Sequence, residues 1–206
     1  MAKKIENPLF RGRVGNLVYY VRNGEQMVRA LPQTVKNPQT PKQQANRARL
    51  KASCLWLSPI KNVLRMGFPK VKSGSAYSHA HSLLLRNAIV DGAVDASKAQ
   101  VAEGTVVPMA GGSLQAEGRQ VSLRWTDNTA GPHATVNDLL VYLFYNPQTK
   151  MVVSNYQHPK PPRRNQCACT VTLPHEAEGT FHVYAFFHNH NRSDASSSVY
   201  LGEVRV

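Results

Sequence analysis

Histidines and cysteines are the first residues in this chain whose spacing suggests chemistry. His182, His188 and His190 share strand parity and could project from one face, and Cys167 and Cys169 could do the same. A zinc site needs three or four such ligands. No acid near the histidines and no second cysteine pair completes either set. We therefore expect no metal and no cofactor, and we interpret the histidines as exposed or partly packed and the two cysteines as small buried strand residues.

Motifs for catalysis are the second feature to consider. The sequence contains no G-x-S-x-G, no G-x-x-x-x-G-K and no H-E-x-x-H. Its acids are scattered, and none are paired as general acid/base work would require. We expect a protein that is not an enzyme and has no catalytic residue.

Basic side chains around an aromatic ring give the strongest chemical indication. Lysine and arginine neutralise phosphates, and aromatic rings contact bases, so together they are typical of nucleic-acid binding. The candidate contacts with nucleic acid or another polyanion are Arg11, Arg13, Tyr20, Arg22, Arg29, Lys42, Arg47, Arg49 and Lys51.

The charge of the chain is concentrated in its first part. Residues 1–90 contain 16 Lys and Arg against two acids, whereas residues 91–206 contain 9 against 10. The whole net charge of +13 therefore belongs to the first part. Such an asymmetry indicates two modules, which we place at 1–90 and 98–206. The basic module should face nucleic acid, an anionic surface or an acidic protein.

The stretch VGNLVYYVRNGEQMVRALP, residues 14–32, predicts a β-hairpin. Asn23-Gly24 favours a type I′ turn, and that turn pairs Arg22 with Glu25. One face of the hairpin then presents Tyr20, Arg22 and Arg29. The opposite face is apolar except for one glutamine and should be buried. Its residues are Leu17, Tyr19, Val21, Gln26, Val28 and Ala30.

Three helices are predicted after a proline-rich connector at 32–41. Thr40-Pro41 is a start signal for a helix over 41–57, in which one stripe contains Ala45, Ala48, Ala52, Leu55 and Trp56. A short helix follows Ser58-Pro59 and ends at Gly67, and a third covers about 75–88.

From about residue 98 the hydrophobic period changes to two. The seven strand candidates are QVAEGTVVPM, RQVSLRWT, DLLVYLFYN, KMVVSNYQ, CACTVTL, TFHVYAFFHN and SVYLGEVRV. The predicted fold class is α+β, with a basic hairpin and short helices followed by an all-β half.

That half resembles immunoglobulin-like and fibronectin type III sandwiches. The resemblance rests on Trp125 in VSLRWT and on the closing FHVYAFFHNHNRSDASSSVYLGEVRV, without the Cys…Trp…Cys spacing of antibody domains. It implies a module for adhesion, spacing or assembly.

The whole chain is also similar to an uncharacterised family that is common in Bacteroidetes. The similarity rests on GNLVYYVRNGEQMVR, NPQTPKQQANRARLKAS, LSPIKNVLRMGF and SSSVYLGEVRV. It implies a two-part layout and assigns no activity.

Three hypotheses for function follow. The first is a non-enzymatic protein that binds nucleic acid non-specifically through its basic module and uses its sandwich for protein contacts or as a homo-oligomer. The second is a structural subunit of a phage particle or of a surface or secreted complex, with the basic arm on an acidic protein partner. An enzyme ranks last. The N-terminus lacks an apolar signal region and no window is long enough for a membrane span, so we expect a cytoplasmic protein or one incorporated into an assembly.

Overall fold

The structure, a computed structural model, describes residues 10–34, 37–71, 74–130 and 132–206. The chain divides after Thr40 into two compact units. We call the first, up to Thr40, the N-terminal sheet and the second, Pro41–Val206, the body. The sequence instead placed the division at about residue 90. Part of the predicted connector, residues 35–36, lies outside the described residues.

The N-terminal sheet has three antiparallel strands in chain order. They are β1 (Gly12–Val14), β2 (Leu17–Arg22) and β3 (Glu25–Ala30). The hairpin prediction is confirmed in its register, since Arg22 pairs with Glu25 and Tyr20 with Met27. Asn23 and Gly24 both have positive φ, 53° and 84°, as a type I′ turn requires. The first strand was not predicted.

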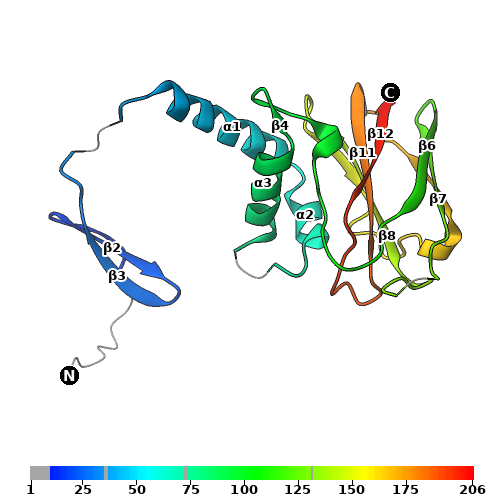
Figure 1. Ribbon diagram of the computed structural model, residues 1–206, viewed down its shortest axis with the longest axis horizontal. Helices are drawn as coiled ribbons and strands as arrows, with labels where there is room; N and C mark the ends of the chain where they lie inside the picture. Colours follow the sequence, from blue (N-terminus) through cyan, green and yellow to red (C-terminus); the bar gives the residue numbers. More distant parts are fainter. Residues whose placement is uncertain (1–9, 35–36, 72–73, 131) are drawn as a thin grey trace. The chain divides into compact units, whose positions relative to one another are not determined.

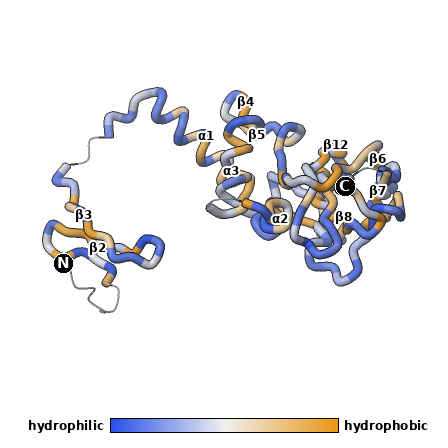
Figure 2. Tube along the Cα trace, turned by 60° about the horizontal axis from the view of Figure 1, so that its bottom comes forward, coloured by the Kyte–Doolittle hydropathy of each residue, from blue (hydrophilic) through white to orange (hydrophobic). Residues whose placement is uncertain are grey.

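The face of this sheet that the sequence predicted to be buried is largely open. Every residue of β3 is exposed, and Leu17 and Val28 keep 41% and 49% of their surface. The ring of Phe10 contacts Tyr19 edge-on at 5.4 Å. The unit contributes no second layer among its described residues, so three short strands leave their apolar side chains uncovered. In Figure 2 the β2–β3 turn is blue and the strands carry orange segments.

The three helices of the body are confirmed as α1 (Pro41–Leu57), α2 (Lys61–Gly67) and α3 (Ala76–Asn87). The stripe predicted for α1 is exposed over the first turns of the helix and again at Leu55. Ala45 and Ala48 are exposed, as are all of residues 41–50, and burial is confined to the last turns around Trp56. The N-terminal half of α1 extends beyond the other elements of the body (Figure 1).

The strands of the body form two larger sheets and one small hairpin. The small hairpin is β4 (Ile89–Val90) with β5 (Ala93–Val94), followed by a short 3₁₀ turn at Ala96–Lys98. A three-stranded sheet has the order β10 (Ala168–Thr172), β7 (Gln120–Thr126), β6 (Ala110–Glu117). A four-stranded sheet has the order β12 (Val199–Arg205), β11 (Thr180–His188), β8 (Leu139–Asn146), β9 (Met151–Ser154). All pairings within these sheets are antiparallel.

Six of the seven predicted strands are confirmed, and the first is wrong. QVAEGTVVPM, residues 100–109, contributes only an isolated bridge at Val106, and the strand of this region is β6 immediately after it. Gly104 and Pro108 interrupt the segment, since proline lacks the donor that a ladder needs. The α+β class is thus confirmed.

The four-stranded sheet is buried on both faces, which explains why the helices belong to the body. On β11, Tyr184 and Phe186 join a core cluster with the helical residues Trp56 and Leu64. The residues that alternate with these two along β11 belong to a second cluster; they are Phe181, Val183, Ala185 and Phe187. This cluster also contains residues of the three-stranded sheet, namely Val121, Leu123, Trp125 and Val171. Because the helices supply one of these two covers, the body includes them.

Candidate nucleic-acid interface

Four of the predicted contact residues lie on one face of the N-terminal sheet. The register pairs Val18 with both Arg13 and Arg29, and cross-strand partners share a face. Tyr20 and Arg22 have the same parity on β2, so they lie on that face too. We call Arg13, Tyr20, Arg22 and Arg29 the basic face.

The basic face is accessible and nearly free of acid. The three arginines are exposed and Tyr20 is half-buried. Glu25, opposite Arg22, is the one acid among the described residues of the sheet. The Nε of Arg13 donates to the carbonyl oxygen of Gly15 at 3.0 Å, which orients this guanidinium beside the β1–β2 turn. Arg11 is also exposed and immediately precedes β1.

The helical candidates form a separate group on α1, in the body. Lys42, Arg47, Arg49 and Lys51 are all exposed. Arg49 has a structural task, because its Nη2 donates to the carbonyl oxygen of Leu85 at 2.9 Å in the last turn of α3. The structure therefore unites four of the predicted residues on one face and leaves the helical set as a second group.

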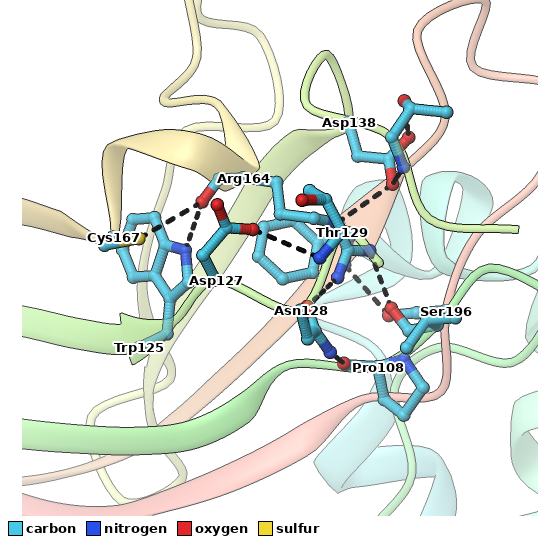
Figure 3. A network of polar contacts seen from close by, with 12 residues as sticks. Pro108, Trp125, Asp127, Asn128, Thr129, Asp138, Arg164, Cys167 and Ser196 are labelled. Carbon is cyan, nitrogen blue, oxygen red and sulfur yellow. Dashed lines mark hydrogen bonds and ion pairs between the residues drawn. The ribbon is translucent and has the colours of Figure 1, made fainter. Parts of the chain in front are cut away.

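One buried arginine, Arg164, which was not predicted from the sequence, connects several polar groups in the interior of the body. Arg164 is fully buried and its Nε donates to Asp138 Oδ2 at 3.0 Å (Figure 3). Its carbonyl oxygen accepts from Trp125 Nε1 at 2.7 Å. Burial lowers the pKa of Arg164, and the neighbouring Asp138 partly offsets that effect. This guanidinium has its partners inside the protein and is not a polyanion contact.

The histidines and cysteines do not gather into a ligand set. Within the described ranges, no group of three or more His, Cys, Asp or Glu could hold a metal ion. His182 Nδ1 lies 3.1 Å from the hydroxyl of Tyr200, His188 is buried, and His190 is exposed. Burial raises the pKa of the Cys169 thiol to about 11, which disfavours the thiolate that metals bind.

The body also carries exposed cations that were not predicted as contacts. Lys160 and Arg163 lie in the segment HPKPPRR, between β9 and β10, and Arg192 lies in the β11–β12 loop. The density of basic residues in KPPRR was the available indication, but the near-zero net charge of the C-terminal part concealed it.

Comparison with known proteins identifies a family without an assigned activity. A model described as "Family of unknown function (DUF6266)" matches residues 9–202. Neither the curated proteins nor the solved structures yield a match to this chain. In the described part of the chain, no helix has both the length and the apolar character needed to cross a membrane.

Proposed function

We propose that this chain, which belongs to the DUF6266 family of unknown function, is a non-enzymatic protein that binds nucleic acid through the basic face of its N-terminal sheet. The observation that carries the proposal is the register that aligns Arg13, Arg22 and Arg29 around Tyr20 on one exposed surface. Arginines neutralise phosphates, and a tyrosine ring between them can stack on a base or sugar.

The charge balance supports this function over simple solubility. Residues 1–90 have 16 basic residues and two acids, far more single-sign charge than a small surface needs to stay soluble. The contacts would be with phosphates, so the binding should be largely independent of sequence and should weaken steeply with salt.

The test uses the full chain and the variant R13Q/R22Q/R29Q with labelled duplex DNA and structured RNA at two salt concentrations. The matched control K61Q/R124Q/R205Q removes the same charge from exposed positions of the body. We expect the sheet variant to bind duplex DNA about 10- to 100-fold more weakly, with a smaller salt slope, because each phosphate contact contributes a slope of about 0.9. Equal weakening in both variants would show that only net charge matters and would reject the proposal.

A second candidate function, a structural subunit of an assembly, is favoured by the other face of the same sheet. Leu17 and Val28 are exposed there, and a three-stranded sheet normally needs such a face covered for stability. A partner protein, or a second copy of the chain, could cover this face with its own apolar surface without contacting the arginines. A defined oligomer without nucleic acid, lost in L17Q/V28Q and retained in R13Q/R22Q/R29Q, would favour this candidate.

We also propose that the seven strands β6–β12 form a fibronectin-like sandwich that serves protein contacts. Support comes from the grouping of strands one, two and five in one sheet and the other four in the second, and from the buried Trp125 on β7. A cytoplasmic location and a wide distribution in Bacteroidetes remain predictions. Fractionation of cells producing the full chain tests the location.

A further inference from the structure

A basic cleft lies in the body, and none of the residues of the basic face lines it. It has a volume of about 630 Å³ and is lined by Leu139, Pro161 and Pro162 together with Lys160, Arg163 and Arg192. The segment between β9 and β10 supplies one side, and the β11–β12 loop supplies Arg192 and His190. Residues about 30 positions apart in the sequence thus converge on one hollow.

The positive charge of this cleft is uncompensated. No Asp or Glu is among the described residues that line it, and no ion pair engages its three cations. The acids closest in sequence to its lining residues Leu139 and Arg192 have partners elsewhere. Asp138 accepts from Arg164 and from the backbone N–H of Thr135 at 2.9 Å, and Asp194 binds Lys70. Three cations around one hollow with no local counter-charge are suited to an anion.

The cations extend from a backbone that is held in place. The N–H of Leu140 donates to the carbonyl oxygen of Pro162 at 2.7 Å, which ties the proline-rich segment to β8. Arg163 is fixed by its backbone N–H to Gln166 Oε1 at 2.8 Å and by its Nη1 to Asn137 Oδ1 at 3.0 Å. A site whose donors are already ordered loses less entropy when a ligand binds.

The backbone of Arg192 has an unusual conformation. Its φ is +57°, a left-handed conformation that arginine seldom adopts, and its N–H donates to the carbonyl oxygen of Asn189 at 2.9 Å. Backbone strain of this kind tends to persist where it positions a functional side chain. Here it accompanies an exposed arginine at the edge of the cleft.

We infer that this cleft binds the phosphates of a single-stranded nucleic-acid segment. The nucleic-acid class of the ligand rests on the proposed function, but the residues are different and the site acts independently of the basic face. The volume falls within the range of about 300–1,000 Å³ typical of sites for compact organic ligands, which suits one or two nucleotides and not the width of a duplex. Leu139, the prolines and the imidazole of His190 offer apolar and flat surfaces for bases.

The test compares the full chain with K160Q/R163Q/R192Q, using a labelled eight-nucleotide oligothymidylate and a labelled duplex as probes. We expect the cleft variant to bind the oligothymidylate about 10- to 100-fold more weakly and its salt slope to fall by about 2, since a single strand contributes about 0.7 per contact. The control K61Q/R124Q/R205Q should change affinity less than threefold. R163K/R192K, which keeps the charge, should retain most of the affinity.

The outcomes separate this inference from the proposed function. If R13Q/R22Q/R29Q weakens duplex binding while K160Q/R163Q/R192Q leaves oligothymidylate binding unchanged, the cleft inference is rejected and the proposed function stands. If the cleft variant alone loses oligothymidylate and the sheet variant binds duplex normally, the cleft stands and the basic face fails. Displacement of oligothymidylate by equimolar inorganic phosphate would reject a nucleic-acid site in favour of a free-phosphate site. Urea unfolding of each variant confirms that the fold is intact.

Discussion

Arg164 and Asp138 form a salt bridge inside the body, with Arg164 Nε 3.0 Å from Asp138 Oδ2 and neither side chain more than 2% exposed. The guanidinium also donates to the carbonyl oxygen of Val107 at 2.7 Å and lies 4.0 Å from the ring centroid of Phe187. One residue thereby links the segment before β10, the start of β8, the segment before β6 and strand β11. The same bridge neutralises the carboxylate closest in sequence to the basic cleft.

Removing either partner of this salt bridge should strongly destabilise the protein. We expect D138N and R164M each to lower the free energy of unfolding by about 3–5 kcal/mol, because the remaining charge or its hydrogen-bond partners stay buried without compensation. The double variant D138N/R164M should cost less than the sum of the two single variants. Urea unfolding followed by tryptophan fluorescence measures this, and additive losses would show that the two residues act independently.

Trp56 should be the residue that joins the helices to the four-stranded sheet. Its ring contacts Tyr145 and Tyr184 edge-on, at centroid distances of 5.2 and 6.2 Å. We expect W56A to lower the unfolding free energy by about 3–5 kcal/mol and to leave a single transition for the whole body. The neighbouring L55A, at a side chain that is 51% exposed, is the matched control and should cost less than about 1 kcal/mol. Separate transitions for helices and strands in W56A, monitored by circular dichroism, would support the predicted division at about residue 90.

Rules that use a few neighbouring residues correctly predicted the turns, helix starts and strands that depend on local backbone preferences. Asn23-Gly24 specified a turn and hence the register of β2 and β3, and Thr40-Pro41 marked the first residue of α1. Period-two patterns located six strands of the body. These features depend on backbone preferences over a few residues, which a single sequence contains.

Features that depend on distant contacts escaped prediction. The double burial of β11 makes VYAFF continuously apolar, and that pattern alone does not say which elements cover each face. β6 was missed because Gly111 and Gly112 weaken the strand pattern, and the ladder to β7 shifts register there.

The sequence predicted which types of residue form the candidate site better than it predicted where those residues lie in the fold. Arginines on the hairpin do share an exposed face, as alternation predicts. Arg49, a predicted polyanion contact, also donates a hydrogen bond to the carbonyl oxygen of Leu85, a contact between helices that sequence spacing does not contain. Lys160, Arg163 and Arg192 were missed because a net charge near zero averages over acids that are paired elsewhere, such as Asp194 with Lys70.

The stability of the protein should depend on pH through Asp194. Burial by itself would raise the pKa of Asp194, but hydrogen bonds from Lys70, Thr105 and Ala195 lower it to about 2. Because the folded-state pKa lies below the ordinary value of 3.8, the carboxylate stabilises the fold above about pH 4, and this contribution is lost as the pH falls toward 2. We expect D194N to reduce the unfolding free energy by about 2 kcal/mol at pH 7 and by much less near pH 2.

Urea unfolding of the wild type and of D194N at several pH values between 2 and 7 measures this difference. D91N, which changes an exposed aspartate, is the control and should track the wild type throughout. A difference between D194N and the wild type that stays constant across this range would show that the carboxylate contributes through packing and not through its charge.

Replacing Gly104, which lies next to the Asp194 carboxylate, should destabilise the protein. A Cβ at this position would lie 2.1 Å from the carbonyl oxygen of Ala195 and 2.5 Å from Asp194 Oδ1, so backbone must move to admit a methyl group. We expect G104A to lower the unfolding free energy by about 2–4 kcal/mol through overpacking. G118A is the matched control, since Gly118 has open space around its Cβ position and its φ of +58° should cost only about 1 kcal/mol. Thermal unfolding of both variants ranks the two effects, and a G104A that is as stable as G118A would mean that the 103–105 segment shifts away from Ala195 without cost.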